Sequence, residues 1–424
     1  MTSYVLSGVR PYGEDAVDVV IADGVIAEIL PVGSGSADEV LELTDQVLLP
    51  GFVDVHTHLR EPGREDAETV LTGTQAAALG GFTAVHAMAN TTPVADTAGV
   101  VEQVWRLGQE YGYCDVHPVG AVTVGLGGEQ LAELGAMADS PARVRIFSDD
   151  GKCVADAVIM RRALEYVKAF DGVVAQHAQE PRLTEGAQMN EGEWSGVLGL
   201  RGWPAVAEEA IIARDVLLAE HVGSRVHICH LSTAGSVDIV RNAKARGIDV
   251  TAEVAPHHLL LTDELACTYD PVYKVNPPLR TMDDVLAVRM GLADGTIDAV
   301  ATDHAPHPHE DKDCEWGAAA FGMLGLQTAL GVVRIATELS WRDIADRMSV
   351  RPARIARLSE QGREIERGAP ANLVVIDPTR EWVVRPDALA SKSTNTPYAE
   401  MTMPVSVTAT FLRGIPTVLN GELQ

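Results

Sequence analysis

The sequence of 424 residues predicts an α/β protein, a (β/α)8 TIM-type barrel with a small discontinuous β domain formed by both chain ends. Strand-like and helix-like segments alternate over roughly 300 residues in the middle of the chain. Short strands separated by turn residues occupy both ends instead. No Gly-x-Gly-x-x-Gly motif follows the first strand of the middle region, so a doubly wound open sheet is the second choice. We therefore expect residues 47–365 to form the barrel, and residues 1–46 and 366–424 to form the β domain.

The two chain ends share one sequence pattern. Turn residues, such as Asp23-Gly24 near the start and Gly368-Ala369-Pro370 near the end, separate or precede short apolar runs. Such runs are typical of antiparallel strands and not of βα units. Because both ends carry this pattern, we expect them to pair into one domain. The expected strands are 4–6, 17–21, 25–30, 372–376, 382–384, 405–411 and 417–419.

In the middle region each expected strand is followed by a loop and a helix, the repeating unit of a parallel barrel. The eight expected strands are 47–58, 82–89, 116–122, 144–148, 173–177, 226–231, 249–254 and 299–303. The expected helices are 67–79, 99–110, 157–170, 205–221, 236–245 and 282–292, with helical pattern continuing from 325 to 358. Active sites of such barrels lie at the carboxyl ends of the strands, so the residues that end these strands are the candidates for the site.

Composition excludes several function classes. The formal net charge of −27 argues against a nucleic-acid partner, and it means that an anionic ligand needs a local cationic clamp. The five cysteines are scattered without a Cys-x-x-Cys pair, so neither a disulfide framework nor a thiolate zinc site is expected, and a reducing compartment fits. The sequence shows no apolar run of about eighteen residues and no secretory signal. We expect a cytoplasmic protein with no membrane partner.

The stretch from Gly51 to Gly63 carries the first candidate metal ligands. It follows an apolar run and ends in a Pro-Gly loop, which is typical of a strand leaving a buried sheet. Because side chains alternate along a strand, Asp54, His56 and His58 are expected to project to one side. Two imidazoles at this spacing can bind one cation, and imidazole nitrogen is a common zinc ligand. A pair of surface histidines is the alternative, so further ligands are needed to decide.

Other polar residues end apolar strands at the same rim, namely Asp149-Asp150, His177, His230 and Asp303. Each alone could be a core histidine or a helix cap. Their joint occurrence favours a metal site, because polar groups that end buried strands are costly to desolvate without a partner. Imidazoles and carboxylates without thiolate suit Zn²⁺, with Mn²⁺ or Co²⁺ as substitutes, and six ligands suit two ions that share a carboxylate. The histidines expected to be structural or solvent-facing are His86, His117, His227, His257, His258 and His309.

Six motifs stand out along the chain, namely Asp54-Val-His-Thr-His-Leu-Arg-Glu-Pro-Gly63, Ser148-Asp-Asp-Gly151, His230-Leu-Ser232, Pro256-His-His-Leu259, Asn276-Pro-Pro-Leu-Arg280 and Ala301-Thr-Asp-His-Ala-Pro-His307. They resemble the motifs of the cyclic amidohydrolases and, within them, of the class I, bacterial-type dihydroorotases. The motifs occur in order, and the similarity runs from residue 47 through the C-terminal β segment. This makes the resemblance far more specific than any single motif.

The resemblance implies two zinc ions per chain. The residues implied for one zinc are His56, His58, Asp150 and Asp303, and those for the second are Asp150, His177 and His230. Hydantoinases in the same superfamily bridge their metals with a carboxylated lysine. The class I dihydroorotases use an aspartate there, and Asp150 matches that position.

The resemblance also implies the substrate contacts. Arg60 supplies the local positive charge that this acidic chain needs for an anionic ligand, and its planar fork suits a carboxylate. A surface salt bridge with Glu61 or Glu65 is the alternative for Arg60. Asn90 keeps its place although the family usually has proline where this chain has Ala89. The implied contacts are His58, Arg60, Asn90, Asn276, His307, Phe321 and Gly322.

Residues 307–320 form a long polar segment that ends at Phe321-Gly322. Loops of this length in compact domains are often functional, so the segment is expected to be a mobile flap that closes over bound substrate. An ordinary surface loop is the alternative.

The activity implied is the zinc-dependent, reversible cyclisation of N-carbamoyl-L-aspartate to L-dihydroorotate with release of water, the third step of de novo pyrimidine biosynthesis. Asp303 is the implied catalytic residue, which accepts a proton and passes it to the departing ring nitrogen, while Arg60 and Asn90 hold the α-carboxylate. The alternatives are a dihydropyrimidinase or an allantoinase, or a non-catalytic dihydroorotase-like partner of aspartate transcarbamoylase. Because every ligand position is filled, the non-catalytic alternative is disfavoured. A homodimer and a complex with aspartate transcarbamoylase remain open as assemblies.

Overall fold

Nine strands drawn from both chain ends form one sheet in the computed structural model, which describes residues 2–424. They are β1 Tyr4–Pro11, β2 Val17–Ala22, β3 Val25–Leu30, β4 Glu39–Glu42, β5 Val47–Pro50, β16 Leu373–Asp377, β19 Ser406–Leu412, β20 Ile415–Leu419 and β21 Glu422–Leu423. Their order is β21-β20-β19-β16-β5-β1-β2-β3, with β4 paired to β1. The sheet has a hydrophobic core that includes Leu6, Ile21, Leu48, Val375 and Phe411. The two ends of the chain therefore share one sheet and one core.

The turn between β2 and β3 lies where the sequence predicts it. Asp23 and Gly24 have φ angles of 53° and 81°. A two-residue hairpin turn that follows the natural twist of its strands needs positive φ at both central positions, which aspartate and glycine tolerate. Ala22 and Val25 pair directly across this turn.

The predicted strand 47–58 is wrong in one respect, because it divides at Gly51 into two strands of different sheets. β5 pairs antiparallel with β16, whereas β6 (Phe52–Thr57) pairs in parallel with β7 (Phe82–Ala87). Gly51 lies so close to Thr83 that a Cβ atom on it would be 2.3 Å from Thr83 Cγ2. The chain passes from one sheet to the other without a loop, so the continuous apolar run gives no sign of the change.

Eight parallel strands carry the candidate site. In addition to β6 and β7 they are β8 Asp115–Pro118, β9 Ile146–Phe147, β10 Val173–Gln176, β13 Val226–Ile228, β14 Val250–Val254 and β15 Ala299–Val300. One sheet has the order β6-β7-β8, and the other has the order β15-β14-β13-β10-β9. Isolated parallel bridges link the two sheets at both edges, one from Gly120 to Phe147 and one from Thr57 to His304. These parallel sheets confirm the α/β class.

Helices follow the parallel strands close to the predicted ranges. They are α1 Val70–Leu79, α2 Ala98–Tyr111, α3 Leu134–Asp139, α4 Ala157–Val167, α5 Glu193–Leu198, α6 Val206–Val222, α7 Ala234–Ala245, α8 Pro256–Leu260, α9 Met282–Asp294, α10 His309–Lys312, α11 Ala329–Ala336, α12 Trp341–Ala345 and α13 Arg351–Ala356. Two-residue strands pair elsewhere, β11 Met189–Asn190 with β12 Gly202–Trp203 and β17 Trp382–Val383 with β18 Thr402–Met403. Thr69, Thr233 and Thr281 begin α1, α7 and α9 by accepting a backbone N–H bond in the first turn, as N-cap residues do.

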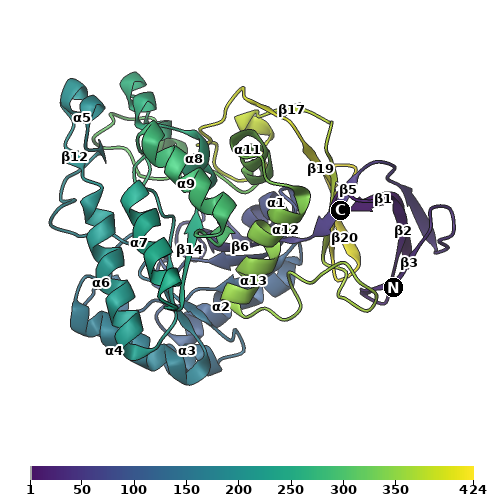
Figure 1. Ribbon diagram of the computed structural model, residues 1–424, viewed down its shortest axis with the longest axis horizontal. Coiled ribbons are helices and arrows are strands. Elements are labelled where there is room, and N and C mark those ends of the chain that lie inside the picture. The colour runs from purple at the N-terminus through teal and green to yellow at the C-terminus, as the bar shows by residue number, and fades with distance from the viewer. Residues whose placement is uncertain (1) are drawn as a thin grey trace.

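The two parts of the molecule lie side by side in Figure 1. Both chain ends are at the right with β1, β2, β3 and β20, and the helices α4, α6 and α7 are at the left. The main hydrophobic core fills the space between the parallel strands and their helices, with Val85, Val116, Phe147, Val174 and Ile228 among its members. Within residues 2–424 no helix is both long and apolar enough to cross a membrane.

Candidate metal centre

Six side chains singled out in the sequence lie together at the carboxyl ends of the parallel strands. They are His56 and His58 at the end of β6, Asp150 after β9, His177 after β10, His230 after β13 and Asp303 after β15. All six are at most 5% exposed. His230 and Asp303 have φ angles of 29° and 46°, so the backbone leaves the extended conformation at these two positions. Backbone strain of this kind clusters at functional sites.

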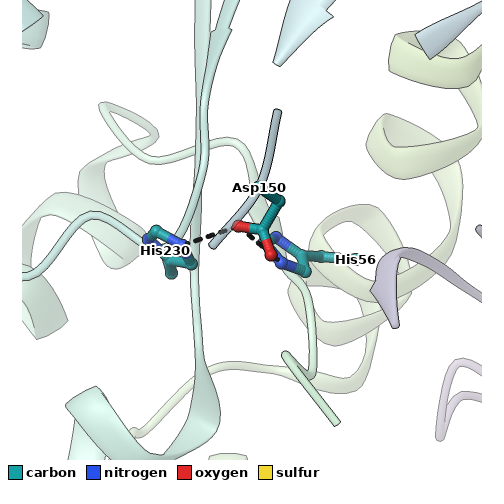
Figure 2. Close-up of side chains that lie close together, drawn as sticks. All are labelled: His56, Asp150 and His230. Carbon is teal, nitrogen blue, oxygen red and sulfur yellow. Dashed lines mark hydrogen bonds and ion pairs between the residues drawn. The ribbon is translucent and has the colours of Figure 1, made fainter. Parts of the chain in front are cut away.

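Asp150 stands at the centre of this group. Its Oδ1 atom lies 3.1 Å from His177 Nδ1 and 3.4 Å from both His56 Nε2 and His230 Nε2. Its Oδ2 atom lies 3.3 Å from His58 Nε2. Figure 2 shows the carboxylate between the rings of His56 and His230, with an interaction drawn to each. One carboxylate therefore faces all four imidazoles.

Asp303 lies near two of the four imidazoles, those of His56 and His58. Its Oδ1 atom lies 3.3 Å from His58 Nε2 and 3.6 Å from His56 Nε2. Two overlapping triads result, His56 with Asp150 and His230, and His56 with His58 and Asp303, and the candidate ligand atoms of each lie within 4.8 Å of one another.

Neighbouring carboxylates that looked equivalent in the sequence are turned elsewhere. Asp149 accepts hydrogen bonds from the backbone N–H groups of Val122 and Thr123, at 2.8 and 3.0 Å, and from the Thr123 hydroxyl. Asp54, expected on the same side as His56, instead accepts from the backbone N–H of Thr302 at 3.0 Å. Both carboxylates therefore bond to neighbouring segments and not to the imidazoles of the centre, which face Asp150 and Asp303 instead.

The imidazoles are oriented by partners outside the group. His56 Nδ1 lies 2.6 Å from Glu253 Oε1, and His177 Nε2 lies 2.8 Å from Gln179 Oε1. Because these oxygens are acceptors, the ring nitrogens that face them carry protons, which leaves the opposite nitrogens, those that face Asp150, as the atoms that would bind a metal. A histidine held in this way by a carboxylate or amide oxygen is the usual arrangement of a metal ligand.

One atom tests whether this donor set fits a divalent cation. His56 Nε2 is buried, and although Asp150 Oδ1 and Asp303 Oδ1 lie 3.4 and 3.6 Å away, it forms no hydrogen bond of good geometry among the described residues 2–424. A buried polar atom without a partner is costly, and a cation between His56, Asp150 and Asp303 would satisfy it. Imidazole nitrogen and carboxylate oxygen are zinc ligands, so the residues present fit the group.

The charges of the centre agree with this fit. Burial alone would raise the pKa of Asp150, but the neighbouring imidazoles of His56, His177 and His230 hold it well below its usual range. Burial likewise opposes ionisation of Glu253, yet His56 and His227 lower its pKa to about 2. These carboxylates are therefore ionised at neutral pH, the form in which a carboxylate binds a metal.

Arg60 supplies a positive charge at the edge of the centre. Its Nε atom donates to Pro306 O at 3.1 Å, and its Nη2 atom lies 3.4 Å from His307 Nε2. Burial lowers the pKa of Arg60 to about 10, which still leaves it charged at neutral pH. Within the described residues 2–424, Arg60 forms no salt bridge with Glu61 or Glu65, the alternative that the sequence left open. The guanidinium therefore keeps N–H groups for a ligand.

The other residues predicted to contact substrate lie around the metal centre. Asn90 Oδ1 accepts from His58 Nδ1 at 2.9 Å, and Asn276 donates to Gln179 Oε1 at 3.2 Å. Asn276 Oδ1 is buried without a hydrogen-bond partner among the described residues. His307 Nε2 lies 2.8 Å from the Phe321 carbonyl oxygen. A Cβ atom on Gly322 would lie 2.8 Å from the same nitrogen, which explains glycine at that position.

Comparison with known proteins finds relatives that match the chain over its full length. A family model described as "Dihydro-orotase-like" matches residues 45–236. The chain is 67% identical to a dihydroorotase of Streptomyces coelicolor and 58% identical to one of Mycobacterium tuberculosis, and each alignment covers 100% of both chains. The chain belongs to the dihydroorotase family.

Solved structures agree on the fold of this dihydroorotase family member. An L-hydantoinase (dihydropyrimidinase) from Arthrobacter aurescens superposes with a TM-score of 0.87 at 22% identity, covering 100% of this chain and 98% of that one. A dihydropyrimidinase from Brevibacillus agri gives a TM-score of 0.83 at 20% identity, covering 100% and 96% of the two chains. At these identities the likeness concerns the fold alone.

Two residues of the centre escaped the sequence analysis. Glu253 lies inside an apolar strand, and a carboxylate in such a strand was a signal that could have found it. Gln179, two residues after His177, carries no comparable signal. Among the histidines outside the centre, His227 Nε2 lies 3.0 Å from Glu253, and the His309 side chain is 78% exposed. His257 Nε2 and His258 Nδ1 are buried without a hydrogen-bond partner among the described residues.

Proposed function

We propose that this member of the dihydroorotase family catalyses the reversible cyclisation of N-carbamoyl-L-aspartate to L-dihydroorotate with release of water, the third step of de novo pyrimidine biosynthesis. The observation that carries the proposal is the 67% identity, over the full length of both chains, to a protein named dihydroorotase. Together with the absence of a membrane-spanning helix in the described residues, the biosynthetic role fits a cytoplasmic enzyme. A homodimer and a complex with aspartate transcarbamoylase stay open as assemblies.

The proposal includes the architecture of the site. The two parallel sheets, bridged at both edges, would close as one (β/α)8 barrel over residues 47–365. The sheet of the two chain ends would be the discontinuous β domain of residues 1–46 and 366–424, to which residues 47–50 contribute β5. A closed barrel is a rigid frame that holds ligands from distant parts of the sequence at one rim.

Two zinc ions per chain are the proposed cofactors. His56, His58, Asp150 and Asp303 would hold one ion, and Asp150, His177 and His230 would hold the other, so that Asp150 is shared. The unpartnered His56 Nε2 atom supports this assignment. When bound, such ions lower the pKa of water to roughly 7 and polarise carbonyl oxygens, the chemistry that opening a cyclic amide requires.

Asp303 and Arg60 have separate tasks in this proposal. Although burial opposes ionisation of Asp303, its hydrogen bond to His58 lowers its pKa, so the carboxylate is free to accept a proton at neutral pH. Asp303 takes this proton from the water that attacks the ring carbonyl and passes it to the ring nitrogen that departs when the ring opens. When the ring closes, Asp303 takes the proton from that nitrogen and returns it to the oxygen that leaves as water. Arg60 binds the carboxylate of the substrate and thereby places the reacting carbonyl at the rim.

An assay on three substrates tests the proposed function. Purified protein is expected to turn over dihydroorotate and to leave dihydrouracil and allantoin essentially unchanged, because only the first offers Arg60 a carboxylate. Faster turnover of dihydrouracil or allantoin would instead make the chain a dihydropyrimidinase or an allantoinase. No turnover of any of the three by metal-loaded protein would favour the non-catalytic alternative.

Replacing Glu253 by glutamine is expected to weaken zinc binding by about 10- to 100-fold, the usual effect of losing a partner that orients a metal ligand. Glu253 accepts from His56 Nδ1, and a neutral amide holds the ring less firmly. The measurement is a zinc titration against a competing chelator. The matched control is Glu68→Gln, another buried glutamate paired with a histidine, His304, that is not a proposed ligand. Equal zinc affinity in the Glu253 variant and the wild type would contradict the proposed orientation.

A buried lysine anchors residues 307–320, the segment that the sequence predicts to be a flap. Lys312 Nζ donates to the carbonyl oxygens of Pro271, Lys274 and Ala320 at 2.9, 3.1 and 2.8 Å. Trp316 is buried in the same segment and donates to Gln188 O at 3.3 Å. We propose that the flap opens by releasing these contacts, so that substrate reaches a centre that is otherwise covered.

Replacing Lys312 by methionine is expected to speed proteolytic cleavage within residues 307–320 by about tenfold, because three carbonyl groups lose their donor. Limited proteolysis with mass spectrometry gives the rate and the site. Lys168→Met is the control, since Lys168 also donates to a carbonyl oxygen but is an exposed residue far in sequence from the segment 307–320. Unchanged cleavage in the Lys312 variant would show that this lysine does not hold the flap.

A further inference from the structure

A pocket of about 400 Å³ lies at the opposite ends of the parallel strands from the metal centre. Its wall includes Asp115, the first residue of β8, and Arg145, which immediately precedes β9. Residues 356–361, at and after the end of α13, complete it. None of the six metal-centre residues lines this pocket. Its volume is within the range of small-molecule sites.

The pocket is positively charged in a strongly acidic chain. Its lining holds four arginines and two carboxylates, an excess of two positive charges, whereas the whole chain carries −27. The charged lining residues are Arg143, Arg145, Arg357, Arg413, Asp115 and Glu360. Such a local reversal of charge attracts anions that the rest of the surface repels.

Two of these arginines are available to a ligand. Arg413 Nη1 pairs with both oxygens of Asp115, at 2.7 and 2.8 Å, and Arg357 Nε pairs with Asp171 at 2.8 Å. Arg143 and Arg145 form no ion pair within the described residues 2–424, and Arg145 Nη1 bonds only to carbonyl oxygens. A guanidinium without a carboxylate partner presents a planar fork that matches phosphate.

The other wall of the pocket is aromatic. His86 and His117 stack with ring centroids 5.2 Å apart and an angle of 24° between their planes, and Trp105 of α2 lines the same pocket. His117 Nε2 is buried and has no hydrogen-bond partner among the described residues. Flat rings and an unused ring nitrogen suit a planar heterocycle, which can stack and also form a hydrogen bond.

We propose that this pocket binds a phosphorylated aromatic ligand of the size of a nucleoside monophosphate, distinct from the substrate of the metal centre. Arg143 and Arg145 would receive the phosphate, and Trp105 with His117 would receive the ring. The proposed reaction uses none of these four residues, so the pocket is a separate ligand site on the far side of the parallel strands.

Calorimetric titration of the metal-loaded protein with uridine monophosphate and adenosine monophosphate tests the proposal. We expect at least one of the two nucleotides to bind with a Kd below about 1 mM. Uridine and adenosine, which lack the phosphate, and inorganic phosphate, which lacks the ring, are each expected to bind at least about tenfold more weakly. Saturating dihydroorotate is expected to leave the affinity unchanged. No binding of either nucleotide, or its displacement by dihydroorotate, would overturn the proposal.

Arg143→Gln is expected to weaken nucleotide binding by about tenfold through loss of one charged contact. Dihydroorotate turnover should stay at the wild-type level. Arg161→Gln changes the net charge equally, but Arg161 is an exposed residue of α4 paired with Glu165, so this control should bind the nucleotide as the wild type does. Equal affinity of the Arg143 variant and the wild type would contradict the assignment, as would an equal loss in both variants.

Discussion

Asp150→Asn is expected to reduce dihydroorotate turnover, measured as kcat/KM, by roughly 10³-fold or more. Asp150 faces all four imidazoles of the centre, and the amide that replaces it carries no charge to share between two cations. Bound metal contributes several kcal/mol to such reactions, and each 1.36 kcal/mol is a factor of about ten in rate. The variant should also retain less zinc than the wild type when both are dialysed in parallel.

Asp149→Asn is the matched control for this result. Asp149 precedes Asp150 and is also buried, but it bonds to Val122 and Thr123 and not to the imidazoles. We expect this variant to lose stability while it keeps its zinc. An Asp150 variant that kept both metal and turnover would contradict the shared-carboxylate arrangement.

Arg60→Ala is expected to lower kcat/KM for dihydroorotate by about 10²- to 10³-fold. The guanidinium is the positive group at the edge of the centre, and truncating it leaves the substrate carboxylate without its charged partner in a buried site. Steady-state kinetics with dihydroorotate and with carbamoyl-aspartate measure the effect in both directions. Arg60→Lys should recover part of the loss, because lysine keeps the charge but not the fork.

Arg106→Ala serves as the control for Arg60, since Arg106 is exposed on α2 and paired only with Glu102. Its removal changes the net charge by the same amount and should leave the kinetics unchanged. If Arg60→Ala turned over dihydroorotate as fast as the wild type, Arg60 would not be the carboxylate-binding residue, and the proposed substrate would lose its main support within the site.

The gathering of these side chains at one rim could be predicted from the sequence because the proposed ligands end apolar strands. His177, His230 and Asp303 each follow a short apolar run, and parallel strands bring such positions to one rim. The roles of the ligands, by contrast, came from the resemblance and not from the spacing. Spacing alone does not separate Asp150 from Asp149, because adjacent residues at a strand end have no fixed direction once the chain enters a loop. The resemblance selected Asp150, and the distances in the structure agree with that choice.

Other features depend on contacts between segments that are distant in sequence, so local sequence patterns could not predict them. Gly51 marks the change between two sheets only through its contact with Thr83. Glu253 becomes part of the centre only when β14 lies near the end of β6 and places it 2.6 Å from His56. The pocket of Arg143 and Arg145 is formed by loops, strands and helices from several parts of the chain, so no sequence motif predicts it.

The zinc content of the purified, untreated protein tests the central claim most directly. Elemental analysis is expected to give about two zinc ions per chain, and removing them with a chelator should abolish dihydroorotate turnover until zinc is restored. Protein that turned over dihydroorotate at the full rate with no divalent metal bound would contradict the proposed role of this cluster of imidazoles and carboxylates.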